Sequence, residues 1–379
     1  MDIPYLIFIL LLLILTYYSF IRNDNKSFLI ALCVVFVFIG LRAPVVGADT
    51  WNYYLYFTGA RSFYNEDTRE LEPAFLLYNE ICRVILFKEG QLYILMNTFL
   101  SFFMIAKLVK KYSERKTLSV LFFFFIVSYP NYFVALRQIL GISFLLVGVW
   151  CVAGNKSFKW FSYLLFTFVG YSFHTSIAIF STIFLVLYFV RINRLVGILA
   201  IILSVLFGLV LQKLDVFMLL DIFFSNGVGL ERLEGYADNA DQNFTDDIQI
   251  FLVLRYSLVA LISIIMIPKE KISNWFTLIY LFGVCLQNIF FGFVLIGRLT
   301  LPFDIFGIIV YTWIFSRGSL CFLGKRRLPY ILTVLVILYF TQSFIKSQIN
   351  YEITSNDRMH PYYFFFEDYR NHPSRKYIY

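Results

Sequence analysis

"FVGYSFHTSIAIF", from Phe168 to Phe180, stands at the centre of a long apolar run between Lys156 and Arg191. A helix that crosses a membrane needs about 20 mostly apolar residues, so this run fits two short membrane-spanning helices better than one. His174 then lies at the turn between them. Comparable apolar segments recur along the whole chain. They predict an all-α, polytopic integral membrane protein.

The composition agrees with this class. Hydrophobic residues make up 60% of the 379 residues and the mean hydropathy is +0.75, whereas soluble domains contain about 45–50% apolar residues. The first apolar segment, 4–21, lacks the basic start and the small-residue cleavage site of a signal peptide, so we expect it to remain as a helix. The five cysteines form no paired or Cys/His pattern. We expect no metal ion and no cofactor.

The distribution of charge predicts an orientation in the membrane. Six short loops hold 17 of the 32 Lys and Arg residues but only three acidic residues. Cytoplasmic loops carry such an excess of basic residues, so we expect these loops inside the cell. They are 22–26, 107–116, 156–159, 191–194, 269–271 and 317–327. The alternating segments then face outward, namely the loops 42–89 and 213–248, the turns at Arg137, His174 and Arg298, and the tail 346–379.

This alternation predicts about 12 spans in one membrane domain covering residues 1–379, with both termini outside. The segment near 74–87 would break the alternation, and its pattern predicts a re-entrant or interfacial helix on the outer side.

A span of 16 residues covers only ~24 Å of a ~30 Å hydrocarbon core. The outer turns at Arg137 and His174 are therefore expected at the floor of an outward-facing cavity, with a kink or turn at 129–133, "YPNYF", beside it. The predicted spans are 4–21, 27–41, 91–109, 117–135, 137–153, 158–173, 174–190, 195–212, 249–267, 274–296, 299–316 and 329–345.

Charged and polar side chains gather at the outer ends of these spans. A charge at membrane depth is costly and therefore points to a functional site. Any one of these residues has a simpler explanation as a snorkelling anchor, a helix-packing group or an ion-pair partner. Arginines in one leaflet instead favour an anionic lipid headgroup, because a guanidinium binds phosphate oxygens in pairs. The residues are Arg42, Arg137, Gln138, His174, Arg255, Arg298 and Asp304, and the outer loops add Asp49, Glu72 and Arg232.

Several short motifs resemble those of the EpsG-like family of O-antigen and exopolysaccharide polymerases, the Wzy type. Their order along the chain and their placement at the membrane carry the resemblance. After Glu72 this chain has Pro73-Ala74 where the family usually has a Gly-Phe pair. The motifs are "LRAPVVGADTWNYYLYF" (41–57), "EPAFLLYNE" (72–80), "LRQILGISFLL" (136–146), "FHTSIAIF" (173–180), "GRLTLPFDI" (297–305) and "HPYYFFF" (360–366).

The resemblance implies a membrane glycosyltransferase that polymerises polysaccharide at the outer, periplasmic face of the bacterial inner membrane. Its substrates would be oligosaccharide repeat units on undecaprenyl pyrophosphate, and the lipid pyrophosphate would be the leaving group. Membrane lipid and a chain-length regulator of the Wzz type are the expected partners, and nucleic acid is not.

The residues agree with that chemistry. A pyrophosphate leaving group needs positive charge where its negative charge develops. We expect Arg137, Arg255 and Arg298 to supply that charge. The acceptor hydroxyl needs a base, for which His174, Asp49 and Glu72 are candidates. The remaining substrate contacts are expected from Arg42, Arg232 and Gln138, and from Tyr53 by stacking on a sugar ring.

Three other functions share part of this pattern. A lipid-linked oligosaccharide flippase or other transporter would need charges across the full membrane depth and often shows internal repeats. Here the membrane charges lie on the predicted outer side, and the sequence shows no repeat. An O-antigen ligase would share the donor and the topology and would differ in the acceptor. An acyltransferase would need its histidine near the cytoplasm, which is the wrong side for His174.

The predicted orientation can be tested by cysteine labelling. Cysteines introduced at Asp67 and Asp241 should react with a membrane-impermeant maleimide on intact spheroplasts, and those at Lys110 and Arg326 should not. Permeabilised spheroplasts should label all four positions, which controls for local accessibility. A reversed pattern at any loop would refute the span assignment on either side of it.

Overall fold

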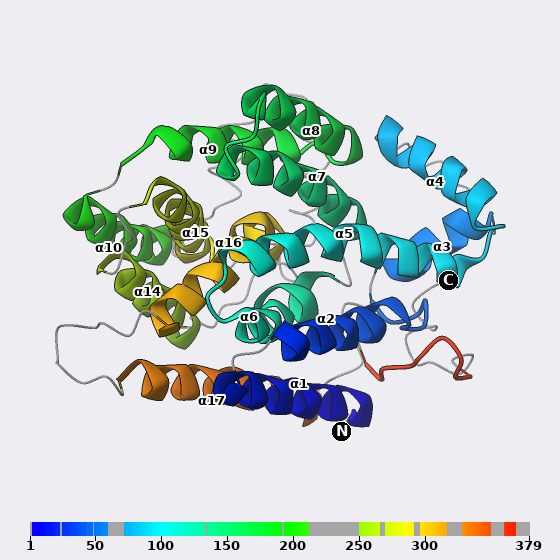
Figure 1. Cartoon of the computed structure of the whole chain (residues 1–379), viewed down its shortest axis with the longest axis horizontal. Coiled ribbons are helices and arrows are strands. Elements are labelled where there is room, and N and C mark those ends of the chain that lie inside the picture. The colour runs from blue at the N-terminus through cyan, green and yellow to red at the C-terminus, as the bar shows by residue number, and fades with distance from the viewer. Residues whose placement is uncertain are drawn as a thin grey trace. The chain divides into compact units, whose positions relative to one another are not determined.

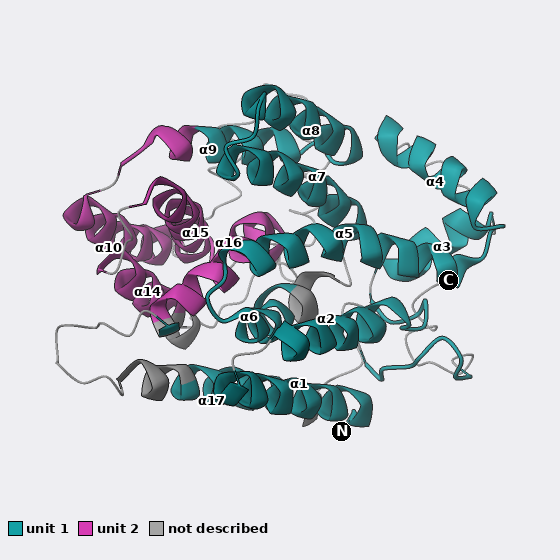
Figure 2. Ribbon diagram, in the orientation of Figure 1, with its two compact units in different colours: residues 1–185, 315–379 teal, residues 186–314 magenta. Residues whose placement is uncertain are grey.

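The computed structural model forms two compact units, residues 1–185 with 315–379, and residues 186–314 (Figure 2). The regular elements of its described part are helices, accompanied by an isolated β-bridge between Arg42 and Phe364. That the two units act as the single predicted domain stays a prediction. The structure describes residues 2–22, 25–47, 49–59, 72–132, 135–191, 193–211, 250–265, 270–291, 296–316, 328–349 and 360–368.

Each predicted span coincides with a helix (Figure 1). Five of the described helices, α1, α5, α7, α10 and α15, are long and apolar enough to cross a membrane. The all-helical membrane class is therefore supported, while the number of crossings and the outward-facing cavity stay predictions. The helices are α1 (Ile3–Arg22), α2 (Asn25–Gly40), α5 (Gly90–Tyr112), α6 (Lys116–Phe122) continued by the π-helix η1 (Phe123–Tyr132), α7 (Leu136–Ala153), α8 (Lys159–Phe173), α9 (Ile177–Phe189), α10 (Arg194–Leu211), α14 (Ile250–Ile265), α15 (Lys271–Ile289), α16 (Ile296–Ser316) and α17 (Leu328–Ile349).

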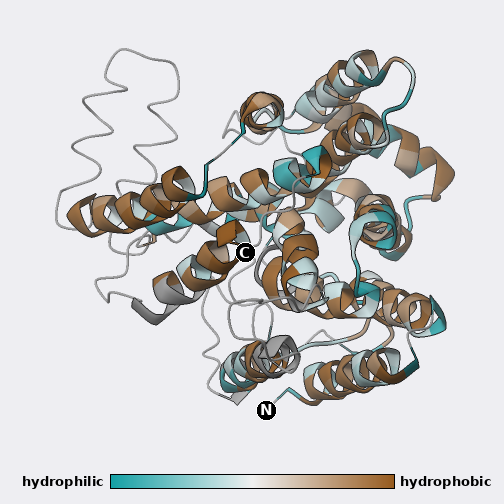
Figure 3. Cartoon of the chain, turned by 60° about the vertical axis from the view of Figure 1, so that its left-hand side comes forward, coloured by the Kyte–Doolittle hydropathy of each residue, from teal (hydrophilic) through white to brown (hydrophobic). Residues whose placement is uncertain are grey.

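The surfaces of these helices are apolar. Figure 3 shows hydrophobic residues along the helices and hydrophilic residues mainly at helix ends and connecting turns. On α8 the large side chains of Phe161, Leu164 and Phe168 are all more than half exposed. Exposed apolar area of this extent is unfavourable in water, and it is what a lipid-facing helix presents.

Helix ends that the charge pattern assigns to the cytoplasm lie together within each unit. In the first unit the Lys116 ammonium donates to the Asn25 side chain at 2.8 Å, and the Ser316 hydroxyl donates to Glu114. In the second unit the Lys271 ammonium lies 3.9 Å from the centre of the Tyr188 ring. Helix ends that are predicted to face the cytoplasm therefore lie at the same end of their unit. That this end faces the cytoplasm stays a prediction.

The opposite end of the first unit holds the N-terminus, the segment after α2 and the tail. The Asp2 carboxylate accepts hydrogen bonds from the Tyr362 N–H at 2.6 Å and pairs with His360 Nδ1 at 3.1 Å. The Ala43 N–H donates to the Tyr363 carbonyl at 2.8 Å. These buried contacts agree with the predicted placement of both termini and residue 42 on one side.

The segment predicted as an interfacial helix is helical. Helix α4 (Pro73–Ile85) buries Phe75 and Asn79 and packs beside α8 and the short helix α3 (Thr50–Thr58). Its opposite face exposes Leu77 and Val84. An amphipathic helix with an apolar exposed face fits a membrane interface, which stays a prediction.

At the predicted kink or turn, "YPNYF", the described residues end at Tyr132, and Phe133 lies outside them. The backbone stays helical through Pro130 and continues to Tyr132 in the wider π geometry of η1. A proline within an α-helix removes a hydrogen bond and clashes with the preceding turn. A π-helix spaces its hydrogen bonds differently, and such segments often occur at functional sites. The next described residue is Ala135, just before α7.

Helices α7 and α8 approach so closely that their backbones touch. A methyl group added at Gly141 would lie 2.9 Å from the Gly170 carbonyl oxygen, and one added at Gly170 would lie 2.7 Å from the Gly141 oxygen. Small residues allow such close helix contacts within membranes. This contact holds the start of α7, with Arg137, near the end of α8, with His174.

Candidate functional site

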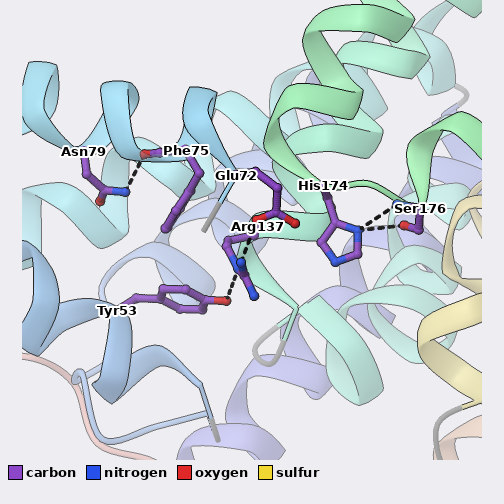
Figure 4. Close-up of polar contacts among 7 residues, drawn as sticks. All are labelled: Tyr53, Glu72, Phe75, Asn79, Arg137, His174 and Ser176. Carbon is purple, nitrogen blue, oxygen red and sulfur yellow. Dashed lines mark hydrogen bonds and ion pairs between the residues drawn. The ribbon is translucent and has the colours of Figure 1, made fainter. Parts of the chain in front are cut away.

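Arg137 is the centre of a polar group in the first unit. Its Nη1 donates to Glu72 Oε2 at 2.6 Å, and its Nε donates to the Tyr53 hydroxyl at 3.0 Å (Figure 4). The Arg137 and Glu72 side chains are 27% and 14% exposed, so the ion pair is shielded from solvent on most sides. Three segments far apart in the sequence therefore meet at one guanidinium group.

The local sequence at Glu72 explains why its carboxylate is available to Arg137. Glu72 occupies the position before the first turn of α4, with extended backbone angles and Pro73 at the first helical position. Proline suits that position because its fixed backbone angle matches a helix and its missing N–H is not needed there. The Glu72 side chain makes no capping bond to its own helix. It extends away from α4 and pairs with Arg137 instead.

A cluster of buried apolar side chains supports this polar group. The Tyr53 ring meets the Phe75 ring edge to face, with centroids 5.6 Å apart, and the Arg137 guanidinium lies 5.8 Å from the Phe75 ring. An apolar surround strengthens the electrostatic attraction within an ion pair. The buried members of the cluster are Tyr53, Phe57, Phe75, Cys82, Tyr93, Leu136, Leu140 and Phe173.

His174 follows the last residue of α8, which packs against both α4 and α7. Its Nδ1 lies 2.7 Å from the Ser176 hydroxyl and 3.4 Å from the Ser176 backbone nitrogen. These contacts fix the orientation of the ring and direct Nε2 away from Ser176. In Figure 4 the ring points into the same region as the side chain of Arg137.

Two tautomers of His174 fit these contacts, because a hydroxyl can donate or accept. When Nδ1 accepts from Ser176, Nε2 carries the hydrogen and is a donor. When Nδ1–H donates to the Ser176 hydroxyl, Nε2 is an acceptor and can take a proton. The geometry therefore equips His174 for either of the two roles that the sequence left open, a phosphate contact or a base.

Arg42 has partners of its own in α2, α3 and the segment between them. Its side chain is buried and donates to the carbonyls of Ile39 at 2.6 Å and Val46 at 3.3 Å, and to the Thr50 hydroxyl at 3.3 Å. These bonds give Arg42 a structural role in shaping the segment that leads into α3. Its predicted contact with substrate stays a prediction.

The other predicted residues of the first unit are close in sequence to this group. Asp49 is half-buried at the residue before α3 and makes no side-chain capping bond to that helix. Gln138 is buried next to Arg137 in α7. Their predicted roles, as base and as substrate contact, stay predictions.

The remaining predicted residues belong to the second unit. Arg298 is half-buried in the first turn of α16, and the buried Asp304 accepts a hydrogen bond from the Thr300 hydroxyl at 3.1 Å. Helix α14 contains Arg255, whose side chain lies outside the described residues, as does the whole of Arg232. The joint action of these arginines with Arg137 stays a prediction.

The structure adds roles that the sequence did not reveal. Tyr53 was expected to stack on a sugar and Glu72 to act as a base, and both are direct partners of Arg137. Ser176 was not singled out, although a serine two residues after a histidine can hydrogen-bond to it within a turn. No local pattern links positions 53, 72 and 137, because their contact depends on how the helices pack.

Comparison with known proteins identifies one family. A sequence model of the EpsG family matches residues 25–364. The matched range includes Tyr53, Glu72, Arg137 and His174. No curated protein and no solved structure matches the chain.

The importance of the Arg137–Glu72 pair can be measured through stability. Glu72→Gln should lower the free energy of unfolding by about 1–3 kcal/mol, because a charged hydrogen bond in a mostly buried position is weakened. The matched control is Glu80→Gln on the same helix, whose side chain is 61% exposed in its pair with Arg83. Exposed pairs contribute about 0.2–1 kcal/mol. The measurement is reversible unfolding in detergent. If both variants lowered the free energy of unfolding equally, the Arg137–Glu72 pair would be no stronger than a surface contact.

Proposed function

The chain belongs to the EpsG family, and we propose that it joins lipid-linked oligosaccharide repeat units into a polysaccharide. Membership makes it a polysaccharide polymerase-like membrane protein. The proposal adds undecaprenyl pyrophosphate as the lipid carrier and the periplasmic face of the inner membrane as the place of reaction. The donor is a growing glycan on its carrier, and the acceptor is the next lipid-linked unit.

The fixed guanidinium of Arg137 is the observation that carries this proposal. Glu72 and Tyr53 hold Nη1 and Nε, while Nη2 makes no hydrogen bond to the described residues. A guanidinium that two partners already hold in place can donate from Nη2 to a phosphate oxygen with little reorganisation. A pyrophosphate leaving group needs such a donor, and an aromatic surround reduces competition from water.

The proposed reaction transfers a glycosyl group between two oxygen atoms. The acceptor hydroxyl oxygen attacks the anomeric carbon of the donor glycan, and a new carbon–oxygen bond forms. The bond between that carbon and the pyrophosphate oxygen breaks, and its electron pair leaves with the pyrophosphate. Arg137 stabilises this developing charge. The hydroxyl proton passes to a base, which is His174 in its Nδ1–H tautomer or the carboxylate of Glu72 or Asp49.

A gene deletion with complementation tests the function. The deletion strain should carry glycan with a single repeat unit, and the intact gene should restore a ladder of longer glycans. Lipid-linked units should still reach the outer face of the inner membrane in the deletion strain. Their accumulation on the cytoplasmic face would contradict the proposal and support a flippase, and full-length polymer left unattached would support a ligase.

Arg137→Lys should lower polymer formation by about 10²-fold or more, although the positive charge remains. An ammonium cannot hold Glu72, Tyr53 and a phosphate at once in the planar geometry of a guanidinium, and removing one donor to a developing charge costs about 10²–10³ in rate. The measurement is polymer per molecule of protein in the complemented deletion strain. Arg22→Lys, at the far end of α1, is the matched control and should keep full activity. Near-normal polymer from Arg137→Lys would reduce Arg137 to a structural residue.

Substitutions of His174 separate its two roles. His174→Ala should abolish polymer formation without lowering protein abundance, because the ring faces the Arg137 region and its Nδ1 contacts Ser176 within the turn after α8. His174→Gln should keep measurable polymer if Nε2 donates to phosphate and none if it accepts a proton, since an amide donates well and is a very poor base. Both variants should fold normally. Reduced abundance with unchanged activity per molecule would show that His174 serves only to pack helices.

A further inference from the structure

Three lysine side chains converge on one tryptophan at the end of α7 far from Arg137. The ammonium groups of Lys107 and Lys111, both on α5, lie 5.8 Å and 5.5 Å from the centre of the Trp150 ring system. The ammonium group of Lys156, from the turn after α7, lies 5.3 Å from the same centre. We call these four residues the Trp150 cluster. Two helices that pack together, α5 and α7, and one turn contribute to it.

The positive charge of this cluster has no matching negative charge in the part of the chain that the structure describes. No carboxylate forms an ion pair with any of its three lysines there. Lys107 and Lys111 are four residues apart on one helix face, an arrangement that costs about 0.2–0.5 kcal/mol through repulsion. The last carbonyls of α7 offset only about half of one charge. The cluster therefore favours an anion.

The usual excess of lysines in cytoplasmic loops does not explain this arrangement. That rule concerns the number of basic residues near a membrane and not where their side chains point. Attraction to one indole contributes about 0.5–1 kcal/mol for an exposed ammonium, and three ammonium groups at one ring also repel each other. An anion between them would turn that repulsion into attraction.

The surroundings of the cluster match a phospholipid rather than a dissolved ion. The Lys107 ammonium also lies 4.3 Å from the Phe103 ring, one turn further into α5, and Phe103 is 43% exposed. The cluster thus presents charged groups beside an exposed apolar ring. A phospholipid could place its phosphate against the ammonium groups and its acyl chain against the Phe103 ring. Basic groups between membrane helices bind such headgroups.

We propose that Lys107, Lys111, Lys156 and Trp150 bind the phosphate of an anionic phospholipid in the leaflet at this end of α5 and α7. The site is distinct from the candidate functional site, because Arg137 is in the first turn of α7 and Trp150 is in its last, ~20 Å away along the helix. The lipid is a bound component of the membrane, and the proposal does not depend on the reaction proposed for Arg137.

Quenching of tryptophan fluorescence by brominated lipids tests the site. The full-length protein is placed in nanodiscs of phosphatidylcholine containing a fixed fraction of brominated phosphatidylglycerol or brominated phosphatidylcholine. The Trp150→Phe variant gives the signal of the other tryptophans, and the difference is the signal of Trp150. Brominated phosphatidylglycerol should quench that signal several-fold more strongly, and the preference should fall with added salt.

Lysine variants decide whether the three named side chains are responsible. A lysine near a membrane surface contributes about fivefold to the affinity for anionic lipid, so Lys111→Gln and Lys156→Gln should each lower the preference severalfold. Lys110→Gln is the matched control, because Lys110 is exposed at the same end of α5 and is not placed at the Trp150 ring. Lys156 lies in an exposed turn, so its variant should fold even if changes on α5 do not.

Three results would overturn the proposal. The first is equal quenching by both brominated lipids in the unaltered protein. The second is a loss of preference in Lys110→Gln as large as in Lys156→Gln, which would indicate general attraction to the basic end. The third is full loss of the preference on adding inorganic phosphate at constant ionic strength, which would identify a site for a dissolved anion.

Discussion

The contact of Arg137 with Glu72 and Tyr53 connects α7 with the start of α4 and with α3. Burying a guanidinium beside apolar helices is costly unless the charge is paired, so its partners must lie close to it. Glu72 brings the start of α4, and Tyr53 brings α3. The rings of Tyr53 and Phe75 then complete the apolar surface on which this charge rests. The close contact of Gly141 with Gly170 places His174 at the same end of the helix pair.

The helices could be predicted from the sequence because a bilayer leaves the backbone little choice. Within lipid every backbone N–H and C=O must be paired inside a helix or a closed barrel, so apolar runs of suitable length mark the helices almost directly. The helical spacing of Asn79, Glu80 and Arg83 within an apolar segment likewise predicted α4. The pairing of charged side chains could not be predicted in this way. Tyr53 and Arg137 are 84 positions apart, and their contact follows from helix packing that no local pattern encodes. The hydrogen bonds from the Arg42 guanidinium to backbone carbonyls could not be predicted from the sequence either. Nor could the π-helix that contains Pro130.

The two ends of α7 carry different kinds of positive charge. At its start one arginine is held by Glu72 and Tyr53, which suits a phosphate that must be bound in a defined orientation. At its end three flexible lysines surround an indole, which suits a mobile anion without a fixed geometry. The proposed reaction would use the arginine, and the proposed phospholipid contact would use the lysines. Because the two groups lie at opposite ends of α7, they can be altered separately.

The most direct measurement uses the purified protein in liposomes with a chemically defined repeat unit on undecaprenyl pyrophosphate. Both the length of the lipid-linked glycan and the release of undecaprenyl pyrophosphate are followed over time. The proposed polymerase reaction predicts that one undecaprenyl pyrophosphate is released for each repeat unit added to a growing chain. Movement of the lipid-linked unit across the bilayer with neither release nor elongation would contradict it.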